Sequence, residues 1–139
     1  MVSSRIVTVE NLTSFNRVLD DKTIFIYIAG YHNTVKQNFI KKIAESNKTK
    51  EWYHFGDVDP DGFYILEHLK KQTGIEFKQL CMGIDELKKY RDYCKTLEDN
   101  DIKKAQSLID KELYVDTMRY MLENNVKLEQ EVVSWKQKV

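Results

Sequence analysis

The chain has 139 residues, 42% of them apolar and 32% charged, so it has the size of one domain and enough apolar side chains for a buried core. Its 22 basic and 22 acidic side chains give a formal net charge of zero, which argues against binding of nucleic acid by bulk positive charge. The two cysteines, Cys81 and Cys94, are too few and too loosely spaced for a disulfide scaffold or a zinc site, which indicates a reducing, cytoplasmic compartment. No apolar run is long enough to span a membrane, and no signal peptide is visible.

Four short segments in the first 83 residues have the β-branched and aromatic composition of buried strands: residues 6–9, 23–29, 52–55 and 77–82. Helices are predicted between them, over residues 11–20, after a cap at Asn33 or Thr34, and from Pro60 to a stop at Gly74. The apolar positions of the second helix are Val35, Phe39, Ile40 and Ile43. This alternation predicts an α/β fold with a mainly parallel four-stranded sheet and helices on both faces.

After residue 83 the pattern predicts helices only. Asp85 can cap a helix that runs through residue 94, and the spacing of Ile102, Ala105 and Ile109 predicts the next one. Further helical segments are expected over residues 114–122 and 128–133, with a break at residues 124–125. We therefore expect one domain over residues 1–139, with an α/β core over 1–83 and a helical extension over 84–139.

Three carboxylates follow two of the predicted strands. Glu10 comes directly after the first strand, and Asp57 and Asp59 follow the third in the sequence Gly-Asp-Val-Asp-Pro-Asp-Gly. Sites in an open parallel sheet form at the carboxyl ends of the strands, near the point where the strand order reverses. We predict a strand order of 2-1-3-4, which makes the first and third strands neighbours and brings these side chains together. Because clustered carboxylates raise one another's pKa values, they indicate a divalent cation, and Mg²⁺ or Mn²⁺ suits such oxygen ligands.

The same acids have plainer interpretations. Asp-Pro-Asp-Gly is also typical of an ordinary turn, and Glu10 taken alone is also typical of a helix start. The spacing of the aspartates matches the start of an EF-hand calcium loop, but the position of that loop's bidentate glutamate holds His68. The calcium-loop interpretation therefore fails.

The residues around these acids resemble a known family. Residues 9–15 (Val-Glu-Asn-Leu-Thr-Ser-Phe), 54–63 (His-Phe-Gly-Asp-Val-Asp-Pro-Asp-Gly-Phe) and 128–131 (Leu-Glu-Gln-Glu) are similar to the C-terminal Toprim domain of the JetD family, the Wadjet anti-plasmid nuclease subunits. This family is related to type IIB topoisomerase A subunits, and the resemblance covers nearly the whole chain. It implies a Toprim (Rossmann-like) fold, with Glu10 as the acid/base or metal-associated glutamate and Asp57 and Asp59 as Mg²⁺ ligands.

The resemblance also implies what surrounds this domain. Family members are longer and carry N-terminal parts that include a winged-helix-like DNA-binding domain, so we expect a C-terminal fragment that is inactive in isolation. The implied partners are DNA (held weakly by this domain alone), those N-terminal domains, SMC-like subunits of the defence complex and a second copy in a homodimer, with no membrane. The segment Gly-Tyr-His-Asn at 30–33 stands where relatives tend to have a glycine-rich turn, and it departs from that pattern.

Other side chains are candidates for supporting roles. Three acids are accessory candidates, with a helix start or a solvated helix face as the alternative: Asp61, Glu129 and Glu131. Three residues of a lysine-rich stretch are candidate DNA contacts, with a solvated helix face as the alternative: Lys36, Lys41 and Lys42. His54 is expected as a strand residue beside the site.

We therefore expect a Mg²⁺-dependent catalytic domain of a DNA-cleaving, nuclease- or topoisomerase-like subunit in bacterial anti-plasmid defence. The alternative is a non-catalytic Toprim-like module that docks partner subunits in a DNA-processing complex, and metal titration near Asp57 distinguishes the two. A receiver-like or phosphatase-like domain ranks lowest, because those domains place an aspartate after the first strand.

Overall fold

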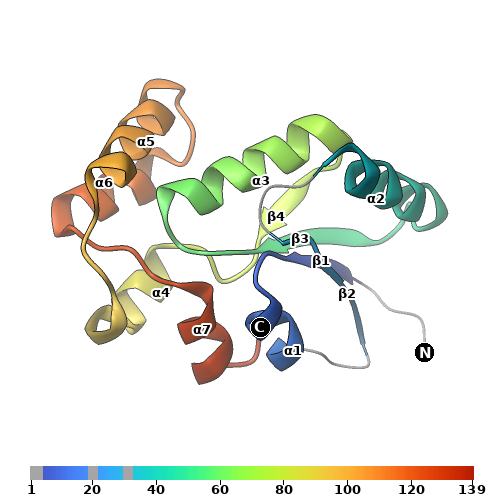
Figure 1. Ribbon diagram of the computed structural model, residues 1–139, viewed down its shortest axis with the longest axis horizontal. Coiled ribbons are helices and arrows are strands. Elements are labelled where there is room, and N and C mark those ends of the chain that lie inside the picture. Colours follow the sequence, from blue (N-terminus) through green and yellow to red (C-terminus); the bar gives the residue numbers. More distant parts are fainter. Residues whose placement is uncertain (1–4, 19–21, 30–32) are drawn as a thin grey trace.

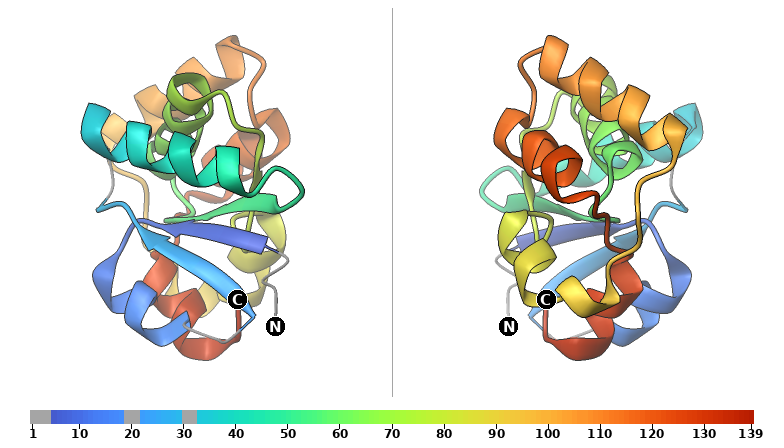
Figure 2. Two further views of the ribbon diagram at one scale, coloured as in Figure 1. Left: turned by 90° about the vertical axis from the view of Figure 1, so that its right-hand side faces the viewer. Right: turned by 90° about the vertical axis from the view of Figure 1, so that its left-hand side faces the viewer.

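The computed structural model describes residues 5–18, 22–29 and 33–139. Its centre is a parallel sheet of order β2-β1-β3-β4, which confirms the predicted strand order. The strands are β1 (Arg5–Val9), β2 (Thr23–Tyr27), β3 (Glu51–Phe55) and β4 (Phe77–Gln79). Helices cover both faces of the sheet, as Figures 1 and 2 show: α2 (Thr34–Ser46) and α3 (Pro60–Thr73) on one, α1 (Leu12–Val18) and α7 (Gln130–Lys136) on the other.

The remaining helices lie between α3 and α7 in the chain and are α4 (Ile84–Lys89), the 3₁₀ turn η1 (Arg91–Tyr93), α5 (Asp99–Asp110) and α6 (Val115–Asn124). In space, α5 packs on α3 and on α6, and α7 packs on α1. Two isolated antiparallel bridges reach the chain that leads into α7: Val58 of the loop after β3 pairs with Leu128, and Lys95, which follows η1, pairs with Lys127. The helical region thus returns to the carboxyl ends of the strands.

One core joins the sheet to the later helices. Apolar side chains of β1, β3 and α3 are fully buried, and so are Met118 and Met121 of α6 and Leu128 before α7. The β-branched residues of β1 suit a strand with neighbours on both sides and helices on both faces. The burial of α6 and of the segment before α7 shows that the C-terminal helices are packed onto the α/β part.

Two strands are shorter than predicted because the backbone turns out of the sheet. β2 ends at Tyr27, and Ala29 has a φ of 54°. β4 ends at Gln79, and Cys81 has a φ of 53°. A left-handed residue cannot continue an extended strand, so these two positions set the strand ends.

Two predicted helices have different bounds. The segment 85–94 is not one helix: α4 ends at Lys89 and η1 follows, and Gly83 rather than Asp85 is the N-cap. The Gly83 N–H donates to the Glu86 side chain at 2.9 Å, which satisfies one of the free donors at this helix start. The last predicted helix begins at Gln130 rather than at 128, because Leu128 pairs with Val58.

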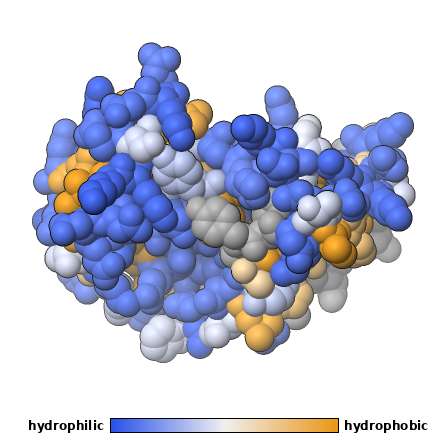
Figure 3. All heavy atoms as spheres, turned by 45° about the horizontal axis from the view of Figure 1, so that its top comes forward, coloured by the Kyte–Doolittle hydropathy of each residue, from blue (hydrophilic) through white to orange (hydrophobic). Residues whose placement is uncertain are grey.

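The predicted cap of α2 is confirmed, but its apolar face is narrower than expected. The Asn33 side chain accepts a hydrogen bond from the Lys36 N–H at 3.0 Å. Ile40 is buried, whereas Val35 is 76% and Phe39 57% exposed. These two residues are therefore corrections to the predicted core. The molecular face that Figure 3 shows is largely hydrophilic.

Some predictions fall on residues that the structure does not describe. The turn at 30–32 and the expected helix residues 19–20 lie outside the described ranges. Within those ranges, Cys81 and Cys94 are free thiols, and no helix is long and apolar enough to cross a membrane.

Candidate metal-binding site at the strand ends

The register of the sheet sets Glu10 beside the loop that carries the two aspartates. Val9 of β1 pairs with Phe55 of β3, and the Glu10 backbone N–H donates to the Phe55 carbonyl at 3.3 Å. The residue after Phe55 is Gly56, where an added Cβ would lie 2.0 Å from the Glu10 Oε1 atom. Glycine is required there because the Glu10 carboxylate occupies the space of a side chain.

Glu10 is a buried acid with an altered pKa. Its residue is 8% exposed, and its Oε1 atom lies 2.7 Å from His54 Nε2. Burial is the main cause that raises the pKa of Glu10 to about 8, and the charge of Asp59 acts in the same direction. A hydrogen bond from the Asp57 backbone lowers this pKa in part. Such a carboxyl group can exchange a proton near neutral pH, as a general acid or base must.

Asp57 is held by the start of α7. Its Oδ1 atom accepts a hydrogen bond from the Gln130 backbone N–H at 2.8 Å. Burial raises the pKa of Asp57 to about 6, although the Gln130 N–H lowers it, and the charge of Glu10 raises it further. The protein therefore does not fully offset the negative charge of ionised Asp57.

Asp59 combines a structural and a candidate metal role. It is the N-cap of α3, and its Oδ1 atom accepts from the Gly62 N–H at 2.6 Å, so this sequence forms a helix start rather than an ordinary turn. Burial raises the pKa of Asp59 to about 7, and the charge of Asp57 adds to the effect. At Gly62 an added Cβ would lie 2.1 Å from the Asp57 carbonyl oxygen, so the tight turn requires this glycine. Among the described residues, no donor contacts the second carboxylate oxygen of either aspartate.

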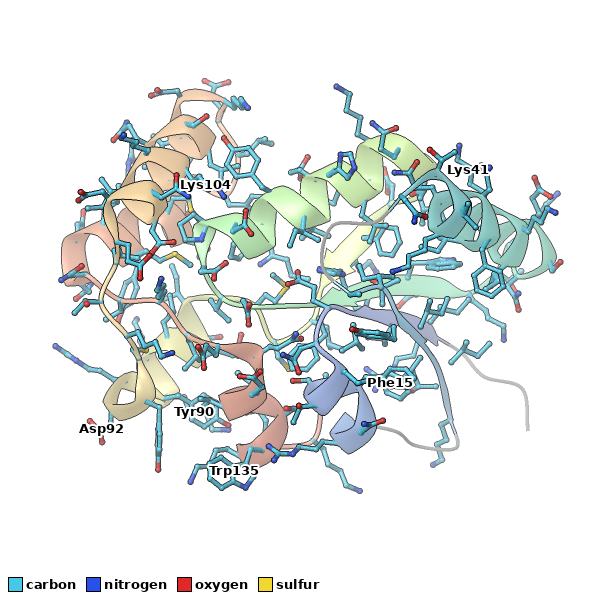
Figure 4. The ribbon with its side chains drawn as sticks, viewed as in Figure 1. Phe15, Lys41, Tyr90, Asp92, Lys104 and Trp135 are labelled. Carbon is cyan, nitrogen blue, oxygen red and sulfur yellow. The ribbon has the colours of Figure 1, made fainter. Side chains whose placement is uncertain are left out.

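The three accessory acids each have a protein partner. Asp61 accepts a hydrogen bond from Lys104 at 2.6 Å, Glu129 from Lys95 at 2.5 Å and Glu131 from Asn11 at 2.5 Å. Figure 4 shows Lys104 on α5, beside the start of α3. Lysines thus compensate the charges of Asp61 and Glu129, whereas the partner of Glu131 is a neutral amide.

Two open pockets meet at Asp57. One of about 580 Å³ has a lining that includes Asp57, Asp59, Glu129, Lys95 and Lys127. The other, of about 490 Å³, has a lining that includes Glu10, Asp57, Asp61, Tyr27 and Gln130. The acids therefore border open space on two sides, which suits access by an extended substrate.

Two lysines that the sequence did not indicate lie with these acids. Lys95 and Lys127 pair through an antiparallel bridge. The Lys127 ammonium lies 2.6 Å from Asp101, with both side chains mostly buried, whereas the Lys95 side chain is 61% exposed. Their sequence positions, on either side of two helices, give no local indication of this pairing, which only the tertiary fold creates.

The lysines proposed from the sequence lie elsewhere. Lys36, Lys41 and Lys42 belong to α2 and line neither of the two pockets. The Lys36 ammonium donates to the Ile28 carbonyl at 3.2 Å, and Figure 4 shows Lys41 on α2, at the opposite end of α3 from Lys104. A DNA-contact role for these three stays a prediction.

The donor chemistry fits a hydrated cation rather than an all-protein cage. Over residues 5–18, 22–29 and 33–139, no group of three His, Cys, Asp or Glu side chains is arranged to hold a metal ion by itself. Mg²⁺ keeps several waters and uses one or two carboxylates, so a complete protein cage is not needed. Asp57 and Asp59 each present one carboxylate oxygen without a protein donor in the described part of the chain, and Glu10 lies next to them.

Fold and site together define an α/β domain with a parallel sheet, helices on both faces of the sheet and a carboxylate-rich site at the ends of two adjacent strands. The family model for the Wadjet protein JetD, C-terminal, matches residues 1–139, so the chain belongs to this family. It is 24% identical over 135 residues to the Wadjet protein JetD of Bacillus cereus (strain Q1), which covers 92% of this chain and 33% of that protein. The chain thus spans about a third of the length of this curated relative.

Proposed function

We propose that this chain is a Mg²⁺-dependent catalytic domain of the Toprim type, with Mn²⁺ as an alternative ion, that acts on DNA phosphodiesters in anti-plasmid defence. One observation carries the proposal: Glu10, Asp57 and Asp59 follow two paired strands, and burial raises the pKa of all three. Membership of the JetD C-terminal family supports the Wadjet context. We also propose a cytoplasmic location, where plasmid DNA is found.

The chemistry follows from the roles that these groups can take. In hydrolysis, water attacks phosphorus and the bond to the leaving sugar oxygen breaks, so one proton leaves the water and one reaches the leaving oxygen. Glu10, with a pKa raised to about 8, is the proposed donor or acceptor for one of these transfers. Asp57 and Asp59 are the proposed metal ligands, and we propose that the Glu10 carboxylate also binds the ion. A bound Mg²⁺ supplies positive charge that offsets the carboxylates and polarises the phosphate.

DNA would meet a mixed surface at this site. Lys95 and Lys127 line the pocket that contains Asp57 and Asp59, and we propose that they contact phosphates beside the reacting one. With zero formal net charge, this domain alone is expected to hold DNA weakly. We propose that most of the affinity for DNA comes from N-terminal DNA-binding domains of the same protein, a second copy and SMC-like subunits.

The test uses substitutions that keep the local hydrogen bonds. Asp57→Asn and Asp59→Asn retain an oxygen for the Gln130 and Gly62 N–H groups but remove both charges. In the full-length protein with Mg²⁺, the double variant is expected to lose DNA cleavage, while Asp92→Asn, an exposed site on η1, keeps it. Cleavage by the double variant at the wild-type rate would contradict the proposal.

A second candidate function is a non-catalytic module that docks partner subunits. The absence of a preformed three-ligand group among the described residues favours it. Calorimetric titration of the 139-residue chain with Mg²⁺ and Mn²⁺ separates the two functions. Binding that Asp57→Asn abolishes supports the catalytic domain, and no binding by the unaltered chain supports the module.

A further inference from the structure

A buried histidine contacts the proposed acid/base through one ring nitrogen and a threonine through the other. His54 is completely buried in β3, opposite Thr8 of β1. Its Nε2 atom lies 2.7 Å from Glu10 Oε1, and its Nδ1 atom lies 2.8 Å from Thr8 Oγ1. Both ring nitrogens therefore have a partner at hydrogen-bond distance, so the ring plane is fixed.

The chemistry of the three groups sets the direction of these hydrogen bonds. The His54 ring is completely buried, and a neutral imidazole has one donor and one acceptor nitrogen. With a cation bound at the site, Glu10 would be ionised and could only accept, so Nε2 would carry the proton and Nδ1 would accept from the Thr8 hydroxyl. The alternative acceptor for that hydroxyl, the Tyr53 carbonyl, is farther away at 3.4 Å. The donors then run from Thr8 through His54 to Glu10.

Close packing leaves the carboxylate little freedom. A Cβ at Gly56 would lie 2.0 Å from Glu10 Oε1 and 3.0 Å from His54 Nε2, so the carboxylate rests against the backbone at this glycine. The Asp57 backbone also hydrogen-bonds to Glu10. A side chain held from two directions keeps one orientation, and such outer hydrogen bonds set the direction of metal ligands in proteins.

We propose that His54 is a positioning residue, which donates through Nε2–H to the ionised Glu10, accepts at Nδ1 from the Thr8 hydroxyl, and so orients the carboxylate toward the metal and substrate. This inference rests on the proposed role of Glu10. It adds a buried partner that acts through Glu10 and touches neither the ion nor DNA.

Three variants of the 139-residue chain separate positioning from packing. His54→Leu fills the space without a donor, His54→Gln carries an amide N–H near the place of Nε2–H, and Thr8→Val removes only the hydroxyl. Loss of an outer-shell partner lowers metal affinity about 10- to 100-fold. We expect His54→Leu to weaken Mn²⁺ binding by about tenfold or more, His54→Gln to recover most of it, and Thr8→Val to fall between. His68→Leu on α3 is the matched control.

The second measurement is independent of metal affinity. Nitrogen-15 NMR of the imidazole rings reports which nitrogen of His54 carries the proton, and we expect the Nε2–H tautomer in the Mn²⁺-free, Mg²⁺-loaded chain. Equal Mn²⁺ affinity of the folded His54→Leu variant and the unaltered chain, or an Nδ1–H tautomer, overturns the inference while the proposed function stands. No metal binding by the unaltered chain is a different outcome, since it contradicts the proposed function itself.

Discussion

Removing the partly buried charge of Asp57 should make the metal-free protein more stable. The change is Asp57→Asn, which keeps an oxygen for the Gln130 N–H but cannot ionise. The pKa of Asp57 is raised from 3.8 to about 6, chiefly by burial, so the folded state binds its proton more tightly than the unfolded chain does. Stability is then lost as the pH rises from the unfolded pKa to the folded one.

The size of the effect follows from the shift. A difference of about two pKa units corresponds to about 3 kcal/mol, at about 1.4 kcal/mol per unit. Well below about pH 4 the Asp57 carboxyl is protonated in both the folded and the unfolded chain, so the variant and the unaltered chain should be equally stable. At about pH 8 the variant should be about 3 kcal/mol more stable, and more if Asp59 also benefits from the lost charge.

Urea unfolding at a series of pH values, with a chelator present, measures this difference. Asp92→Asn, which changes an aspartate that Figure 4 shows pointing away from the fold, is the control and should follow the unaltered chain. Saturating Mg²⁺ should reverse the order at about pH 8, because only the unaltered chain gains binding energy. A variant that is no more stable than the unaltered chain at about pH 8 without metal refutes the assignment of Asp57 as a partly buried carboxylate whose charge its protein partners do not offset.

Three further substitutions test other parts of the site. Gly56→Ala should destabilise the fold by about 1–3 kcal/mol and weaken Mg²⁺ binding in calorimetry, because the methyl group would displace the Glu10 carboxylate. Gly83→Ala, where the nearest atom lies 3.6 Å away, should leave Mg²⁺ binding unchanged. Asp59→Ala should be about 1 kcal/mol less stable in thermal unfolding than Asp59→Asn, because only asparagine keeps an oxygen for the helix cap, and both variants should lose metal affinity. Lys127→Met should cost about 1–3 kcal/mol in urea unfolding, because its acidic partner on α5 stays mostly buried, and it should weaken DNA binding by the full-length protein; equal stability would contradict the pairing.

The order of the sheet was predictable because composition and turn residues mark the elements. Short β-branched strands alternate with capped helices, and Pro60 and Gly74 bound α3 as predicted. The incorrect predictions, of strand ends and of buried positions on α2, have a common cause, because both depend on tertiary structure. The strand ends depend on residues with positive φ, such as Ala29 and Cys81, and alanine and cysteine are not residue types from which a positive φ can be predicted. Likewise Phe39 lies on the exposed side of α2 although its spacing suits a core position.

The acid site was predictable only in outline. Adjacent parallel strands place Glu10 and the Asp57 loop at one edge, and this follows from strand order alone. The contacts that define the chemistry depend on register and on distant segments. Thr8 and His54 face each other only because β1 and β3 pair in one register, and Lys95 reaches Lys127 only through the fold of the intervening helices. Sequence spacing carries no information about such pairs.

The helical region completes the site and is not merely attached to the α/β core. The first N–H of α7 donates to Asp57 across 73 residues of sequence, and the bridge between Val58 and Leu128 holds the two segments side by side. Without these contacts, Asp57 would lose the one backbone donor that offsets its buried charge. The acids of the first 59 residues therefore reach their final electrostatic state only when the last helix has packed. A division of function between an α/β catalytic part and a separate helical part does not fit this dependence.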